Sequence, residues 1–140
     1  MKENYLIKIN GLQMQDDEKN DVTLSTRGNF VEKNGKYYII YKESETTGYL
    51  GCTTTVKVEG ENKVSMTRQG PMPSQLIIEK NNRNVCHYET GYGSLALGIS
   101  ANYIKNNLTS EGGKVEFAYE MDLNSSSIST NTIKIDIKRS

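Results

Sequence analysis

Apolar and polar residues alternate with a period of two along most of the chain. The clearest run is 114–123, in which every second residue is apolar and most of the residues between are charged. Similar runs occupy 22–28, 51–59 and 133–138. One apolar face and one wet face are typical of antiparallel sheet, whereas strands of a parallel sheet are usually apolar on both faces. The pattern therefore predicts an all-β protein built from antiparallel strands.

Turn signals separate these runs at short intervals. The Asn34-Gly35 pair is a strong signal for a two-residue hairpin, and Gly112-Gly113 precedes the run that follows it. Pro71 and Pro73 interrupt the chain after Gly70, because proline cannot donate a hydrogen bond to a central ladder. The runs amount to about eight to ten strands, at the spacing of about 8–12 residues expected of a sandwich or a barrel.

One stretch in the second half of the chain shows two competing patterns. Ala101, Ile104 and Leu108 are spaced as on one face of a helix, but the alternation runs straight through 95–103. We expect one long, bent strand here, with Gly98 at its kink or bulge.

A closed up-and-down barrel fits these strands better than a sandwich does. The last runs approach about ten residues, longer than the usual ~5–6, as tilted barrel strands tend to be. The connections are short, and closure removes exposed strand edges. The sequence shows no internal repeat, linker or low-complexity segment. It therefore predicts a single domain over 1–140, folded as one closed antiparallel β-barrel.

Charge and hydropathy indicate which kinds of binding partner the chain is unsuited to. The chain carries 17 Lys and Arg against 17 Asp and Glu, a formal net charge of zero. Nucleic-acid binding usually needs a surplus of cations on one face. The most basic stretch, at Lys134, Lys138 and Arg139, is interrupted by Asp136, and we interpret it as a solvated strand face. No stretch approaches the ~20 apolar residues of a membrane helix, so we expect neither a nucleic-acid nor a membrane partner.

The cysteines and the N-terminal region bear on the compartment. Cys52 and Cys86 lie far apart without a CxxC pattern, and no apolar export signal is visible near the N-terminus. Free buried thiols are typical of a reducing compartment, so we expect a cytoplasmic protein. The alternative is a disulfide or redox pair.

Arg68 is the first candidate for a functional residue. It is in phase with Val64 and Met66, and it should point inward if they do. A buried guanidinium needs a carboxylate or an anionic ligand, because an unpaired buried charge is costly. Arg68 therefore either anchors the acidic head of a small ligand, or pairs with an internal Glu or reaches solvent at the rim.

The segment 87–94 is the second candidate. His87 is the only histidine, which excludes a multi-histidine metal site, and no carboxylate cluster has ligand spacing. His87 shares a strand face with Glu89, and the two are placed to form an acid–base pair, whereas Cys86 points to the opposite face. The alternative is a wet strand face followed by a Gly-Tyr-Gly bend.

The aromatic residues are unusually rich in hydroxyl groups. The chain has nine Tyr, two Phe and no Trp, and Tyr37, Tyr38 and Tyr41 cluster on one predicted strand. Buried Tyr hydroxyls need hydrogen-bond partners. These residues therefore either line a partly polar, water-containing interior or lie at the barrel rims and on its outer face.

Several of these motifs follow one another in an informative order. Arg68-Gln69-Gly70, Glu79, the segment 88–95, and Gly112-Gly113-Lys114 before Tyr119 stand in sequence over much of the chain. This order resembles the YwiB-like family of bacterial β-barrel proteins. The resemblance implies a calycin-like barrel, the architecture shared by lipocalins and fatty-acid-binding proteins, in a bacterial cytoplasm. It carries over no catalytic residue, and the family's recurrent polar positions fall here on Arg68, Tyr88, Thr90 and Tyr92.

Together these observations lead to one prediction about function. We expect a non-enzymatic barrel that binds a small amphipathic or anionic molecule inside it or at its mouth, without a metal or cofactor. The alternatives are a small enzyme that uses His87 with Glu89, and a protein–protein adaptor. We expect a monomer or a weak homodimer. The predicted ligand contacts are Arg68, His87, Tyr88, Thr90 and Tyr92.

Overall fold

The computed structural model describes residues 4–90 and 93–140, without the side chains of 88–90 and 94. Within these residues lie ten antiparallel strands and one short 3-10 helix, so the all-β prediction is confirmed. The strands are β1 (Tyr5–Gln15), β2 (Glu18–Lys33), β3 (Lys36–Lys42), β4 (Thr53–Glu59), β5 (Lys63–Gln69), β6 (Ser74–Glu79), β7 (Arg83–Thr90), β8 (Gly93–Thr109), β9 (Gly112–Leu123) and β10 (Ser126–Arg139), and the helix η1 spans Glu45–Thr47.

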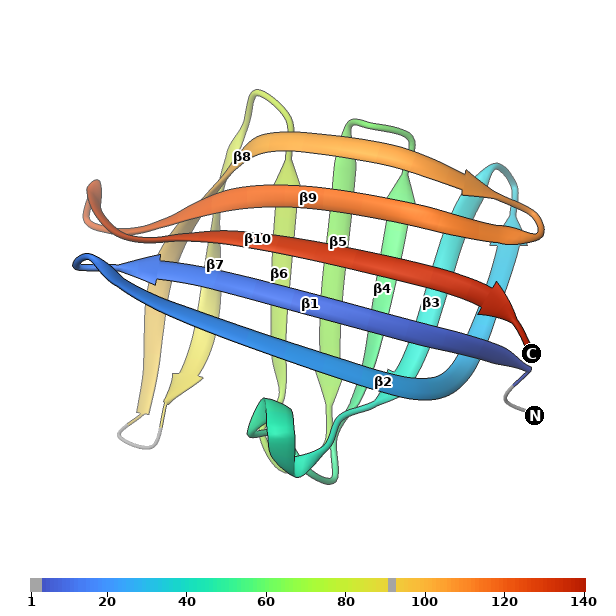
Figure 1. The fold of residues 1–140 in the computed structure, drawn as a ribbon. Coiled ribbons are helices and arrows are strands. Elements are labelled where there is room, and N and C mark those ends of the chain that lie inside the picture. The colour runs from blue at the N-terminus through green and yellow to red at the C-terminus, as the bar shows by residue number, and fades with distance from the viewer. Residues whose placement is uncertain (1–3, 91–92) are drawn as a thin grey trace.

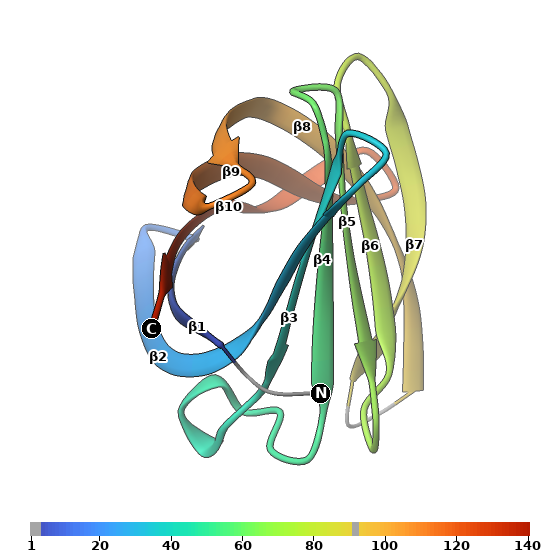
Figure 2. The ribbon, with the colours of Figure 1, turned by 90° about the vertical axis from the view of Figure 1, so that its right-hand side faces the viewer.

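The strands form one sheet that folds into two layers around a core. In Figure 1, β1, β9 and β10 cross over β3, β4, β5 and β6, and Figure 2 shows the two layers from the side. The longest strands, β2 with 16 residues and β8 with 17, bend and contribute to both layers. Strands that bend in this way form the corners of an orthogonally packed barrel.

The β2 strand turns its corner at Gly28. Residues before it pair with β1, residues after it pair with β3, and Gly28 itself stands opposite both Tyr5 and Tyr41. A Cβ atom at this position would lie 2.3 Å from the Ile40 carbonyl oxygen and 2.6 Å from Ile7 Cδ1. Only a residue without a side chain allows so close an approach.

The β8 strand passes from its ladder with β7 to its ladder with β9 over residues 98–100, and a bulge follows between Ala101 and Tyr103. The bulge is therefore not at Gly98, as one form of the prediction had it. Gly98 instead makes room for Arg83, whose Nη2 would lie 2.3 Å from a Cβ there. From this position Arg83 donates two hydrogen bonds to the Asp122 carboxylate, at 3.0 Å and 2.6 Å. The bulge also moves Tyr103 out of phase with Ala101, to a position where it is 36% exposed.

The sheet has a seam between its two edge strands. The strand order is β6-β5-β4-β3-β2-β1-β10-β9-β8-β7, and β6 and β7 share no ladder; an isolated bridge joins Glu79 at the end of β6 to Asn82 in the turn before β7. Away from this bridge the two strands diverge (Figure 1). The Ile77 N–H donates to Cys86 Sγ at 3.4 Å, so a side chain takes the place of a ladder carbonyl. The barrel is thus nearly closed, with one unsealed seam, rather than fully closed as predicted.

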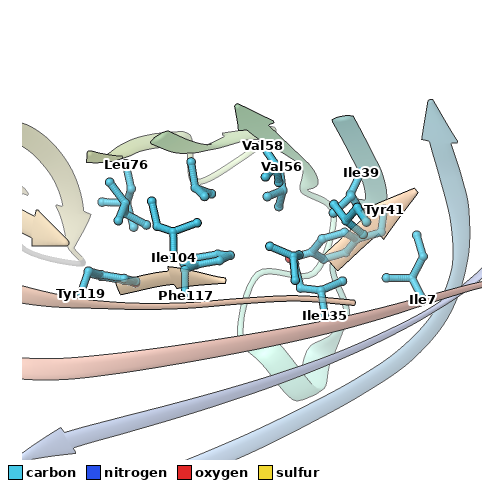
Figure 3. Close-up of a cluster of buried hydrophobic side chains, with 14 of the residues drawn as sticks. Ile7, Ile39, Tyr41, Val56, Val58, Leu76, Ile104, Phe117, Tyr119 and Ile135 are labelled. Carbon is cyan, nitrogen blue, oxygen red and sulfur yellow. The ribbon is translucent and has the colours of Figure 1, made fainter. Parts of the chain in front are cut away.

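The apolar faces of the two layers meet in a well-filled core. Figure 3 shows Ile39, Val56 and Val58 of one layer facing Phe117 and Ile135 of the other. All five side chains are buried. The alternation in 51–59 and 133–138 therefore predicted the inward faces of β4 and β10 correctly, and that in 114–123 predicted the inward face of β9 except at Leu123, which is exposed.

We predict that Gly28→Ala destabilises the fold by about 1–3 kcal/mol, because the new methyl group collides with backbone atoms that cannot move away independently. Urea unfolding followed by far-ultraviolet circular dichroism measures the change. Gly11→Ala in β1 is the matched control, since a Cβ there meets nothing within 4 Å. Equal stability of the two variants would contradict the assigned role of Gly28.

Candidate functional site

A row of polar and aromatic side chains crosses one end of the barrel interior. Tyr41 on β3 pairs with Thr54 on β4, Thr54 pairs with Arg68 on β5, and Arg68 pairs with Ser74 on β6. Cross-strand partners lie on the same face of a sheet, and Tyr41 and Thr54 are both buried in the interior. In the middle of the barrel, the inward-facing positions of these four strands are apolar. At this end of the barrel, they carry hydrogen-bonding side chains instead.

Arg68 is the cation of this row. Its guanidinium carbon lies 3.4 Å from the centroid of the Tyr49 ring, a close cation–π contact. Its Nε is buried and has no hydrogen-bond partner among the described residues. Ion pairs between described residues do not include Arg68 either. The guanidinium is therefore stacked on an aromatic ring, while one of its inner donors is unsatisfied.

The loop that carries Tyr49 is shaped by its own sequence. Ser44 caps η1 by accepting a hydrogen bond from the Thr46 N–H at 3.2 Å, and Gly48 ends the helix in the left-handed conformation. The Cys52 N–H then donates to the Tyr49 carbonyl oxygen at 3.0 Å. These local bonds turn the chain back across the end of the barrel and set Tyr49 against Arg68.

Glu43 brings a carboxylate to the same end of the barrel. Its N–H donates to the Cys52 carbonyl oxygen at 2.9 Å, and its Oε2 accepts a hydrogen bond from Thr54 Oγ1 at 2.5 Å. Glu43 and Thr54 are both buried. Burial and the nearby Glu43 carboxylate raise the pKa of Tyr41 well above its usual value, and Arg68 opposes this shift. The Tyr41 hydroxyl therefore stays protonated at neutral pH.

A small cavity lies beside this row. Its volume is about 220 Å³, and Tyr41, Glu43, Tyr49, Tyr119 and Asn131 are among its lining residues. This volume is below the roughly 300 Å³ at which ligand pockets usually begin. The partly polar, Tyr-lined interior that composition suggested is thus present only in part, because Tyr5 and Tyr37 pack on Phe30 instead.

A larger pocket lies at the seam. We call it the seam pocket; its volume is about 430 Å³, within the range of small-molecule sites. It opens where β6 and β7 diverge, and its lining belongs to β5, β6, β7 and the turn before β6. The lining residues with polar side chains or a thiol are Thr67, Arg68, Ser74, Gln75, Cys86 and His87.

The structure brings two of the predicted ligand contacts to this one pocket. Arg68 and His87 both line it, although β5 and β7 lie on opposite sides of the seam, and His87 is exposed. Tyr88 and Thr90 belong to β7, but their side chains, like that of Glu89, lie outside the described residues, as does Tyr92. The ligand roles of all five predicted contacts, and the pairing of His87 with Glu89, stay predictions.

Sequence reasoning missed the residues around Arg68. Glu43 follows Tyr41 at a spacing of two and so continues the inward phase, which was the available signal. Thr54 is one of the residues of 51–59 that were predicted to point inward. The sequence does not show that its hydroxyl bonds to Glu43. Nothing in the pattern indicated that Tyr49, in an irregular loop, would cover a guanidinium.

In the described part of the chain, no three His, Cys, Asp or Glu side chains come together as ligands for a metal ion. The same residues include no helix with the length and apolarity that crossing a bilayer requires. Cys52 and Cys86 are both buried and unpaired, as predicted.

Comparisons with known proteins point to one family. A family model described as a domain of unknown function, DUF1934, matches residues 7–135. The uncharacterized beta-barrel protein YwiB of Bacillus subtilis strain 168 is 27% identical over 123 residues, which cover 86% of this chain and 84% of that protein. The crystal structure of ywiB protein from Bacillus subtilis has a TM-score of 0.76 at 23% identity, covering 94% of this chain and 89% of that one. The resemblance predicted from the order of motifs is confirmed, and the solved structure shows the shared fold.

We predict that Thr54→Val destabilises the protein by about 1–3 kcal/mol, because it leaves a buried Glu43 carboxylate oxygen without its hydrogen bond. Thr55→Val, the next residue on β4 and on the outer face, is the control and should leave stability unchanged or slightly raised. Denaturant unfolding of both variants measures the difference. A Thr54→Val protein as stable as the Thr55→Val protein would show that the hydrogen bond contributes nothing.

Proposed function

The chain belongs to the DUF1934 family, and from that premise and its geometry we propose that it binds a small anionic or amphipathic molecule at the seam pocket, without catalysing a reaction on it. The observation that carries the proposal is the unsatisfied Nε of Arg68 beside a pocket of ligand size. Calycin-like architecture is part of the proposal, supported by the up-and-down order of the strands.

Arg68 supplies the attraction for an anion. A guanidinium has five N–H donors in a fixed plane and stays charged at any physiological pH. The Tyr49 ring covers the plane of the Arg68 guanidinium, with 3.4 Å between the ring centroid and the guanidinium carbon. Only the edge of the guanidinium is therefore available for hydrogen bonds. A carboxylate or phosphate oxygen is the natural partner of that edge, because planar donors and such anions match in geometry.

The rest of the pocket suits a partly polar molecule. Thr67, Ser74, Gln75 and His87 line it with hydroxyl, amide and imidazole groups, which can donate or accept hydrogen bonds. Ile77 and Val85 add apolar surface on the two sides of the seam. A few polar groups among apolar ones are typical of small-molecule sites.

The size of the two spaces favours the seam over the interior. The cavity beside Glu43 is about 220 Å³, and the middle of the barrel is filled by buried side chains such as Phe117, Ile39 and Val56. A lipocalin-like ligand wholly inside the barrel would have to displace that core. We therefore place the ligand at the seam, at the end of the barrel where Arg68 lies.

We also propose a setting for this activity. The two buried free thiols suit a reducing compartment, which supports the cytoplasm. With the ligand site inside one chain's own seam, a monomer or weak homodimer is sufficient for binding.

We predict that protein purified without denaturation carries a small-molecule adduct in native mass spectrometry, and that Arg68→Met loses it. Met keeps much of the packing on Tyr49 and removes the charge. The free energy of unfolding should change by no more than about 1 kcal/mol, because the lost cation–π contact is offset by relief of an unpaired, partly buried cation.

Lys57→Met on β4 is the control, since Lys57 lies on the outer face of the neighbouring strand and lines none of the spaces described above. It should keep the adduct. The proposal is wrong if the adduct survives Arg68→Met. It is also wrong if the wild-type protein carries no adduct and gains none from phosphate, citrate or decanoate at millimolar concentration.

A further inference from the structure

A third hollow lies on the outer face of the barrel, in the layer formed by β1, β2, β9 and β10. Its volume is about 530 Å³. It is separate from the seam pocket, whose lining comes from β5, β6, β7 and the turn before β6. We call it the basic groove, and define it by Leu6, Lys8, Arg27, Lys114, Asp136 and Lys138.

The strand register sets these side chains side by side. Leu6 on β1 stands between Arg27 on β2 and Lys138 on β10. In the adjacent row, Asp136 on β10 stands between Lys8 on β1 and Lys114 on β9. Neighbouring strands lie about 4.8 Å apart, so the charged groups of both rows can reach one ligand.

The groove has an excess of positive charge in a chain whose net charge is zero. Its four cations face one carboxylate, which lies 3.8 Å from the Lys114 ammonium group. Ion pairs between described residues include none of Lys8, Arg27 and Lys138, and Arg27 only donates a hydrogen bond to Ser140 Oγ at 3.3 Å. Three cations therefore surround Leu6 with no carboxylate of the described residues within ion-pair distance of them.

Leu6 gives the groove an apolar centre. It is 45% exposed, although it occupies the middle of a row and has a cation on each side. Exposed apolar surface framed by unpaired cations complements a molecule with an apolar part and an anionic end.

We propose that the basic groove binds a small organic dianion with an apolar portion, of the alkyl or aryl phosphate class. Three cations around one apolar contact match the doubly charged, three-oxygen end of a phosphate monoester better than a single carboxylate. The volume is that of a small-molecule site. A polyanion fits less well, because Asp136 and Glu116 break the cationic surface along β9 and β10. The site is independent of Arg68 and of the proposed function at the seam.

Phenyl phosphate is the probe, titrated into the full-length protein and followed by two-dimensional amide NMR. Saturable shifts should centre on Leu6, Lys8, Arg27 and Lys138. Lys8→Gln and Lys138→Gln should each weaken binding about tenfold. Lys134→Gln is the matched control, on the same strand and face as Lys138 but outside the groove, and should weaken it less than about twofold. Arg68→Met should leave the affinity unchanged.

The apolar contact has its own test. Leu6→Ala should weaken phenyl phosphate several-fold and leave the affinity for inorganic phosphate unchanged, because only the first ligand contacts the side chain. The substitutions at Leu6, Lys8, Lys134 and Lys138 are all at exposed positions, and an unchanged melting temperature checks that the fold is intact.

Four outcomes would overturn the proposal. They are the absence of saturable binding at millimolar phenyl phosphate, equal effects of Lys134→Gln and Lys138→Gln, shifts that centre on the seam pocket, and equal affinity for phenyl and inorganic phosphate. Lysine-dependent binding to phosphatidylserine vesicles or to single-stranded DNA, in place of phenyl phosphate, would instead assign the surface to a membrane or a nucleic acid.

Discussion

The ladder between β1 and β10 is the interaction on which the rest of the structure depends. Among the described strands it is the only pairing between strands that are not consecutive, and it aligns Tyr5 with Arg139 and Met14 with Thr130. It joins two meanders, β1–β6 and β7–β10, so that the apolar face of each can be buried against the other. Loop-closure entropy opposes contacts between such distant segments, and the ladder must overcome it before the core can form.

This one pairing also places the polar features of the surface and the interior. It brings Lys8 and Lys138 to the same groove, although they are separated by most of the chain. In the opposite layer, the register of β3, β4, β5 and β6 aligns the polar row that includes Arg68. Strand register thus builds the basic groove, whereas the seam pocket combines the register of β5 and β6 with the turn before β6 and with Tyr49, which an irregular loop places on Arg68.

The strand faces were predictable from sequence because a period of two depends only on local backbone geometry. That is why the inward phase of Phe117 and Ile135 was correct before the fold was known. The bulge in β8 was misplaced because its position depends on two neighbouring ladders, and Gly98 carries the same signal for a kink as for a close contact with Arg83. The hydrogen bond between Glu43 and Thr54 was missed because each residue alone is an ordinary polar residue.

Because of the seam, the barrel is not held closed by hydrogen bonds around its whole circumference. A fully hydrogen-bonded cylinder can widen only by breaking a ladder along its length, whereas here β6 and β7 are joined mainly by a turn, one bridge and the contact from Ile77 to Cys86. A change in the circumference of this barrel would require none of its nine ladders to break, because β6 and β7 share no ladder. Arg68, whose Nε has no hydrogen-bond partner among the described residues, lines the pocket at this same seam.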